Sequence, residues 1–182
     1  MEDTALDRCW RHSLATAVVS SEIADWAHQD SGDAYTAGIL HDIGRLGLIA
    51  VDPSKYLQLI DKALKQGGAL CDHEREVYGL DHSVADEWLA ASWGLPASTC
   101  NAIRDHQLPR TSPDDEIARI VNYACRIADI LSFSVLENRG GGDEPITEFL
   151  ATLPAARRDR LNISIPEFQT LIASRVNALE SP

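Results

Sequence analysis

The sequence predicts an all-α protein, a compact bundle of about eight helices folded as one domain. Apolar residues recur at the three-and-four spacing of helices along most of the 182 residues, and no run alternates as strands do. Apolar residues make up 45% of the chain and charged residues 24%, as is usual for a globular protein. A chain of this length can bury a sizeable hydrophobic core without disulfides.

The first half of the chain contains helical segments with recognisable ends. Residues 5–28 carry apolar stripes on more than one face, which predicts a helix buried on most sides. A second helix is expected over 33–47, ending at its two glycines. Asp52 and Pro53 then provide an N-cap and a first-turn proline, and Gly67 supplies the stop.

The rest of the chain predicts further helices, divided by glycine, proline and acidic caps. The clearest start signal is Ser112-Pro113 followed by two acids that face the helix dipole, and the apolar stripe of this helix continues to Leu131. The other helices are expected over 72–78, 82–93, 96–107, 146–153 and 166–180.

Three consecutive glycines at 140–142 divide the chain in two. We expect residues 1–138 to form a helical core and residues 139–182 to form a helical extension packed on the same domain. The longest apolar stretches are only a few residues long, so no segment is expected to span a membrane. The first residues lack the pattern of a secretory signal, which predicts a cytoplasmic protein.

The chain is strongly acidic, with a net charge of −12 and a pI near 4.8. Such a chain repels phosphate backbones and anionic lipids, so binding to extended nucleic acid or to a membrane surface is not expected. A small phosphorylated ligand remains compatible with this charge if a local cation such as a metal ion offsets it.

The four cysteines are scattered singly and form no CxxC pair. In a chain of this size without a secretory signal they are expected to be buried thiols in a reducing compartment, and ligation of zinc by cysteine is the alternative. They are Cys9, Cys71, Cys100 and Cys125.

His41 and Asp42 stand side by side at the end of an apolar helix. They are two metal-ligand types about 100° apart around one helix, so they can share one ion or let the carboxylate bridge two. A buried carboxylate without a partner would cost several kcal/mol, so this position needs a cation.

Four more residues of the same chemical types lie in or at the ends of apolar segments. Each has an ordinary structural explanation, as a cap, a hydrogen-bonded core histidine, a partner of a helix dipole or a salt-bridged acid. Together they give the order His, His-Asp, His, His, Asp over several helices. The four are His12, His82, His106 and Asp129.

With this order the chain resembles the HD superfamily of metal-dependent phosphohydrolases, and it is most similar to the HDOD branch found in bacterial signalling proteins. The resemblance covers about residues 9–131. The helical module that usually precedes this core in HDOD proteins is missing, so the chain is either a fragment or a stand-alone core. The matching motifs are WRHS at 10–13, GILHDIGRL at 38–46, EVYGLDH at 76–82 and WGLP at 93–96.

The resemblance implies a metal site. It assigns His12, His41, Asp42 and Asp129 to a first divalent ion. In two-metal relatives of the HD-GYP type, Asp42 would bridge to a second ion held by His82 and His106. The chain departs from those relatives at three points. Gln107 stands where they have a second histidine, Arg45 replaces a lysine, and the GYP motif is absent.

The resemblance also implies a chemistry. Imidazole and carboxylate ligands suit Mn, Fe, Co, Ni or Zn better than Mg. A bound ion would present hydroxide to phosphorus, with Asp42 among the catalytic residues, Arg45 as a phosphate clamp and Asp105 as a proton donor. The leading hypothesis is a phosphohydrolase acting on a phosphorylated small molecule or nucleotide. The alternative is a non-catalytic signalling module that retains a metal site and binds a signalling partner.

Overall fold

The computed structural model describes residues 5–107, 116–135, 144–158 and 164–180. Within these ranges the chain is all-α, with helices, turns and no strand, as the sequence predicts. The first helices are α1 (Ala5–Ala27), α2 (Ser31–Leu40), α3 (Ile43–Val51), α4 (Pro53–Gln66), α5 (Leu70–Tyr78), α6 (His82–Ser92) and α7 (Ala97–Asp105). They are followed by α8 (Glu116–Ala128), the π-helical turn η1 (Asp129–Phe133), α9 (Glu144–Thr152), α10 (Ala155–Arg158) and α11 (Ile165–Glu180).

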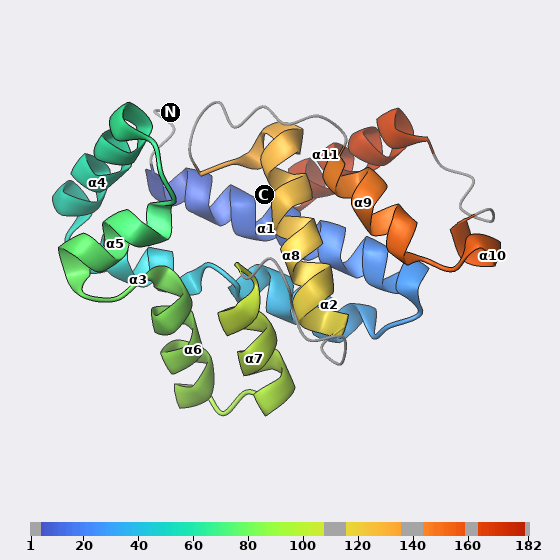
Figure 1. Ribbon diagram of the computed structural model, residues 1–182, viewed down its shortest axis with the longest axis horizontal. Coiled ribbons are helices and arrows are strands. Elements are labelled where there is room, and N and C mark those ends of the chain that lie inside the picture. Colours follow the sequence, from blue (N-terminus) through green and yellow to red (C-terminus); the bar gives the residue numbers. More distant parts are fainter. Residues whose placement is uncertain (1–4, 108–115, 136–143, 159–163, 181–182) are drawn as a thin grey trace.

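Helix α1 is the central element of the bundle. It runs across the molecule and packs against α2, α3, α8 and α11 (Figure 1). Val19, Ile23 and Ala24 on this helix are completely buried. The prediction of a helix buried on most sides is therefore confirmed, and these other helices pack around it.

The predicted helix over 33–47 is in fact two helices, which corrects the sequence-based expectation. Helix α2 ends at Leu40, and α3 begins at Ile43 and continues past both glycines to Val51. The backbone of Asp42 leaves the helical region, with φ −122° and ψ 17°. The break occurs because the His41 and Asp42 side chains turn into the interior, where both are completely buried.

The caps predicted for the next helices are present. The Asp52 side chain accepts a hydrogen bond from the Lys55 amide, and Asp81 accepts one from the Val84 amide. Gly67 has a positive φ of 72°, as a helix stop at this position requires. Helices α4 and α5 form one side of the molecule, and α6 and α7 lie side by side at another (Figure 1).

The last long helix of the core ends earlier than predicted. Helix α8 stops at Ala128, and the chain continues into η1, where Ser132 adopts a left-handed conformation with φ 69°. The sequence pattern predicts that this helix continues to Leu131, because the apolar stripe continues through the turn. Its predicted start at Ser112-Pro113 and the glycines at 140–142 lie outside the described residues.

The C-terminal helices share a core with α1. Phe149 of α9 and Phe168, Ile172 and Val176 of α11 belong to the same buried cluster as Ile23. Helices α9 and α11 match the predicted segments, and the short α10 between them was not predicted. The division at residue 138 stays a prediction. None of the described helices has the length and apolar character needed to cross a membrane.

Candidate metal centre

Five of the six predicted metal-ligand residues meet at one buried point, the carboxylate of Asp42. Its Oδ2 lies 3.6 Å from His12 Nε2 and 3.5 Å from His41 Nε2. Its Oδ1 lies 3.3 Å from His82 Nε2 and 3.7 Å from His106 Nε2. All five side chains are at most 3% exposed, so the cluster is an interior feature.

The ends of helices bring these residues together. His41 and Asp42 occupy the break between α2 and α3, His82 is the first residue of α6, and His106 directly follows α7. His12 comes from the middle of α1. The three helix ends and the central helix converge because their apolar faces pack on one another, which explains why residues 94 positions apart share one site.

Each histidine is held by a hydrogen bond at its Nδ1. The acceptors are the carbonyl oxygens of Phe133 for His12 at 3.0 Å, of Gly38 for His41 at 2.7 Å and of Ile103 for His106 at 2.6 Å, and the Glu74 carboxylate for His82 at 2.5 Å. A carbonyl or carboxylate oxygen accepts a hydrogen bond, so Nδ1 carries the proton, and in the neutral ring Nε2 then presents a lone pair. This outer set of acceptors is typical of metal-ligating histidines.

The cluster fits a cation. His12 Nε2 and His41 Nε2 lie 3.3 Å apart, and with Nδ1 as the donor on each ring their lone pairs face each other. Asp42 Oδ1 is buried and makes no hydrogen bond. Acceptors gathered in this way without a cation between them are unfavourable.

The protonation states of His41, His106 and Asp42 agree with this description, whereas Asp42, Cys71 and Glu74 outweigh burial at His82 and raise its pKa to about 10. Burial lowers the pKa of His41 well below 6.5 and that of His106 to about 4, so both imidazoles are neutral. Burial alone would raise the pKa of Asp42, but Arg45 and the surrounding histidines hold it well below its usual range. Neutral imidazoles and an ionised carboxylate are the forms that bind metal ions.

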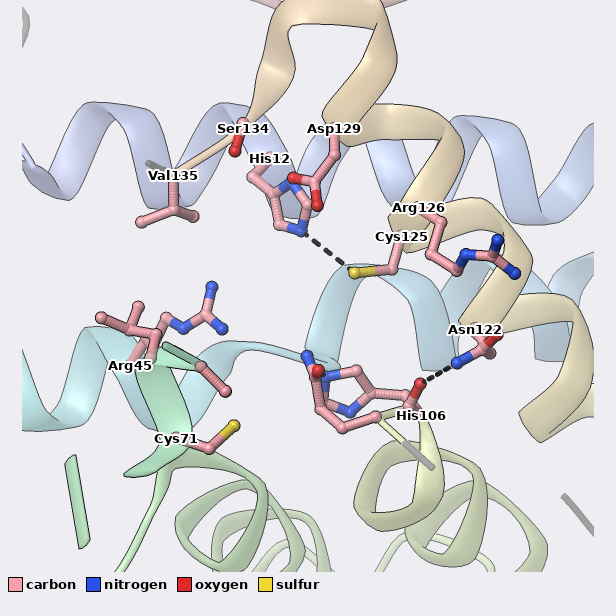
Figure 2. A pocket seen from close by; sticks show the side chains of 13 residues that line it. His12, Arg45, Cys71, His106, Asn122, Cys125, Arg126, Asp129, Ser134 and Val135 are labelled. Carbon is pink, nitrogen blue, oxygen red and sulfur yellow. Dashed lines mark hydrogen bonds and ion pairs between the residues drawn. The ribbon is translucent and has the colours of Figure 1, made fainter. Parts of the chain in front are cut away.

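Asp129, the sixth predicted ligand, lies on the far side of the His12 ring. Its Oδ1 is 3.7 Å from His12 Nδ1, the nitrogen that donates to Phe133, and its side chain is 24% exposed. Figure 2 shows Asp129 beside His12, at the start of η1. In this arrangement Asp129 contacts the ring nitrogen that points away from Asp42.

Arg45 occupies the space between Asp42 and His82. Its Nη1 donates to Asp42 Oδ2 at 2.7 Å, and its Nη2 lies 3.1 Å from His82 Nε2. Its Nε is 3.7 Å from Glu74 Oε1, and the residue is only 7% exposed. The guanidinium therefore supplies a fixed positive charge inside the cluster.

Asp105 pairs through its carboxylate with its neighbour Arg104 and is not among the residues that line the pocket beside the cluster. Arg104 holds both of its carboxylate oxygens, at 2.7 Å and 2.8 Å, and also contacts Glu87. The neighbouring residue Gln107 instead reaches the cluster, since its side-chain amide lies 2.8 Å from His106 Nε2.

The structure adds residues that the sequence analysis did not select. Glu74 is fully buried and accepts hydrogen bonds from Tyr56, at 2.6 Å, and from His82. Asp86 is also buried, accepts a hydrogen bond from the Gly44 amide and has its pKa raised by burial. Asp86 follows His82 by four residues on one helix face, a spacing that could have identified it.

A pocket of about 140 Å³ opens beside the cluster. His12, His106 and Asp129 form part of its wall, and Arg45 and Arg126 give it positive charge. Figure 2 shows these side chains around the pocket, together with Cys71 and Cys125. The pocket is large enough for a small ligand next to the Nε2 atoms.

The all-α fold and the buried histidine and aspartate cluster define a domain of the HD type whose cluster could hold a metal ion. A family model for the HDOD domain matches residues 1–109. The chain belongs to the HDOD family. A search among curated proteins finds no significant match.

Solved structures with the same fold come from several bacteria. A protein of Shewanella amazonensis SB2B that is provisionally named a phosphohydrolase matches with a TM-score of 0.65 and 23% identity, over 91% of this chain and 58% of that one. An HDOD domain protein of Geobacter sulfurreducens matches with a TM-score of 0.66 and 20% identity, over 93% and 58%. The MmoQ response regulator of Methylococcus capsulatus matches with a TM-score of 0.60 and 28% identity, over 78% and 60%.

The first two proteins are less than 25% identical to this chain, so the likeness to them shows the fold alone. The chain also spans only 58% to 60% of the length of these three proteins.

Proposed function

We propose that this HDOD domain is a regulatory module of a bacterial signalling protein that retains one divalent metal ion and does not hydrolyse phosphoesters. The observation that carries the proposal is the position of Arg45. In the first half of the cluster, the lone pairs of His12 and His41 face each other beside Asp42 Oδ2, an oxygen that also accepts a hydrogen bond from Arg45. In the second half, the Arg45 guanidinium stands where the two-metal relatives would need a second ion.

Electrostatics favours one ion over two. A divalent ion 4 Å from a guanidinium is repelled by on the order of 8 kcal/mol at an effective dielectric constant of 20. Arg45 is fixed by two hydrogen-bonding contacts and by Glu74, so it cannot move away at low cost. The Gln107 side-chain amide also contacts His106 Nε2, which a second ion bridged by Asp42 would need as a ligand.

Two of the three residues expected to catalyse hydrolysis, Arg45 and Asp105, are engaged in other contacts. Both terminal nitrogens of Arg45 contact residues of the cluster, and the side chain also lines the pocket. Both carboxylate oxygens of Asp105 are held by Arg104. These engagements support a binding role over a catalytic one.

One ion would have a clear structural role here. When bound, it would supply positive charge and Lewis acidity at the Nε2 atoms of His12 and His41 and at Asp42. Those residues connect α1 to the α2–α3 break, and His82 and His106 connect the same carboxylate to α6 and α7. The cluster residues thus join α1, the α2–α3 break, α6 and α7 at one point. A module whose conformation changes when the ion binds needs such a connection.

The similarity to a response regulator, at 28% identity, supports a signalling context. In this proposal the domain acts with other parts of a longer protein, such as the N-terminal module of HDOD proteins, or with a separate signalling partner.

A phosphohydrolase with one ion is the second candidate. The pocket beside the cluster favours it, because His12 and His106 reach a space that a phosphorylated small molecule or nucleotide could enter. Here Arg45 would clamp the phosphate after leaving Asp42.

Metal analysis combined with turnover separates the two candidates. We expect the purified protein to hold one Zn, Fe, Co, Ni or Mn ion per chain, and to leave a phosphomonoester, a phosphodiester and nucleoside triphosphates intact. His41→Ala and Asp42→Ala should each empty the site, and Cys71→Ala should not. Arg45→Ala should admit a second ion, because it removes the competing charge.

Two results would overturn the proposal. Two ions in the unaltered protein would show that Arg45 does not exclude the second. Turnover that disappears in Asp42→Ala would establish the phosphohydrolase instead.

A further inference from the structure

A cysteine thiol lies against the metal-facing nitrogen of His12. Cys125, on α8, has its Sγ 3.5 Å from His12 Nε2 (Figure 2). That nitrogen also faces His41 Nε2 and Asp42 Oδ2. The Cys125 sulfur and the two Nε2 atoms all lie within 4.8 Å of one another, so one ion could touch all three.

Four of the six spacings among these donor atoms match those of a tetrahedral zinc site. With Zn–N, Zn–O and Zn–S bonds of usual length, tetrahedral angles put two nitrogens about 3.3 Å apart, nitrogen and oxygen about 3.4 Å apart, and nitrogen and sulfur about 3.6 Å apart. The two imidazoles are 3.3 Å apart, Asp42 Oδ2 is 3.5 Å and 3.6 Å from them, and Cys125 Sγ is 3.5 Å from His12.

Asp129, the ligand that the family resemblance implies, is in a poorer position than Cys125. The two residues lie one turn apart along the chain, at the end of α8 and the start of η1. Asp129 contacts His12 Nδ1, which is the donor to Phe133, and Cys125 contacts Nε2, which carries the lone pair.

We propose that Cys125 is a ligand of the ion held by His12, His41 and Asp42, and that its thiolate makes the site selective for borderline-soft ions of the zinc class over Mn and Mg. The proposal rests on the metal centre of the proposed function. As the sulfur–metal bond forms, the thiol proton passes to solvent. The Asp42 carboxylate and the thiolate then balance the two charges of the ion, with two neutral imidazoles as the remaining ligands.

Four protein ligands would also close the site. Structural zinc sites have four such ligands, whereas catalytic ones leave a position for water. Ligation by Cys125 therefore gives a physical reason for a module that keeps its ion without hydrolysing a substrate. A simple hydrogen bond from the thiol to His12 Nε2 is the competing explanation, and it predicts no sulfur–metal bond.

Cobalt is a direct probe, because Co²⁺ bound to thiolate absorbs strongly in the near ultraviolet through charge transfer from sulfur. The whole chain, freed of metal by a chelator, is titrated with Co²⁺. We expect the band in the unaltered protein and in Cys71→Ser, which removes the other thiol of the same pocket. Cys125→Ser should lose the band and bind Co²⁺ at least tenfold more weakly. Cys125→Asp should shift the preference from Zn²⁺ toward Mn²⁺.

A second measurement needs no variant and so does not depend on how Cys125→Ser folds. Zinc should protect Cys125 of the unaltered protein from iodoacetamide, as seen by peptide mass analysis, and leave Cys71 equally reactive with and without metal.

The outcomes separate the two proposals. Cobalt that binds without the charge-transfer band, or zinc that leaves Cys125 reactive, would overturn the role of Cys125 and leave the metal centre of the proposed function standing. A chain that binds neither Co²⁺ nor Zn²⁺ would overturn both.

Discussion

Asp42 is the residue at which the local structure, the electrostatics and the candidate chemistry of this domain meet. It breaks the helix that the sequence pattern would continue, and it is surrounded by four imidazole nitrogens and one guanidinium. Two other acids, Glu74 and Asp86, are buried near it. The pKa of Glu74 is lowered because hydrogen bonds from His82 and Tyr56 and the charge of Arg45 outweigh its burial, whereas burial dominates at Asp86 and raises its pKa.

The buried imidazoles predict a stability that depends on pH. Burial lowers the folded-state pKa of His106 to about 4 and that of His41 well below 6.5, so between these values the unfolded chain binds more protons than the folded one. The share of stability that His41 and His106 contribute in the metal-free protein is therefore fully present above pH 6.5 and falls toward pH 4, by about 1.4 kcal/mol per pH unit for each imidazole. His82 acts in the opposite direction, because its folded-state pKa is raised to about 10 and its share is lost as the pH rises from 6.5 toward 10. Urea unfolding with a chelator at several pH values measures this slope.

A variant assigns the slope to a residue. His106→Gln should remove the part of the pH dependence of stability that comes from the His106 imidazole and leave the part that comes from His41. An unfolding free energy that stays constant between pH 5 and 7 in the unaltered protein would contradict neutral, buried imidazoles.

At the scale of elements, the packing of α3 on α6 depends on Gly44. A Cβ atom at this position would lie 2.5 Å from the His82 carbonyl oxygen and 2.8 Å from the Asp86 amide nitrogen. Both are backbone atoms that cannot move aside alone. We expect Gly44→Ala to destabilise the fold by about 1–3 kcal/mol, as overpacked cores do, and to weaken metal binding by separating Asp42 from His82.

Gly47, on the same helix, is a matched control. A Cβ atom there would meet only Leu89 Cδ1, at 3.9 Å. Gly47→Ala should stabilise the protein by about 0.5–1 kcal/mol, because alanine is the better helix former. Thermal unfolding of the two variants and a metal titration test both statements, and equal effects of the two substitutions would contradict the close approach of α3 to α6.

These elements also show what a sequence can and cannot predict. The caps at Asp52 and Asp81 act within three residues, so the local pattern is enough to predict them. The break at His41 and Asp42 arises from partners on other helices, which no local pattern contains. For the same reason the sequence predicts one helix over 33–47 where the structure has two.

Some residues of the candidate site can likewise be predicted from the sequence, and others cannot. Unusual residues in apolar surroundings, such as His12 and Asp42, are visible in the sequence. Glu74 is hidden in a run of charged residues that resembles a solvated face, and Cys125 is hidden in an apolar stripe where a cysteine is an ordinary core residue. The position of Arg45 depends on three groups from distant segments, and only the folded structure reveals it.

At the scale of the whole molecule, the C-terminal helices are expected to unfold together with the HDOD core. Phe168 of α11 is 1% exposed and lies 4.9 Å from the Trp26 ring of α1, measured between ring centres. Phe168→Ala should destabilise the entire domain by about 3–5 kcal/mol. Leu179→Ala, on the same helix but 55% exposed, should change stability by less than about 0.5 kcal/mol.

Denaturant unfolding followed by circular dichroism and by tryptophan fluorescence measures this coupling. One shared transition that shifts in Phe168→Ala is the expected result. Two transitions, of which Phe168→Ala affects only one, would mean that residues 139–182 form a separate unit.

The hydrogen bond between His12 and the Phe133 carbonyl connects positions 121 residues apart, and this separation sets an order of events during synthesis. When the ribosome has released the first 109 residues, the chain already contains His12, His41, Asp42, His82 and His106, but it lacks the carbonyl that orients the His12 ring. Closing so long a loop is slow compared with forming local helices. The nascent chain therefore acquires its oriented set of ligands only after Phe133 has been synthesised, and we expect metal to be captured after α8 and η1 have formed instead of guiding the early steps of folding.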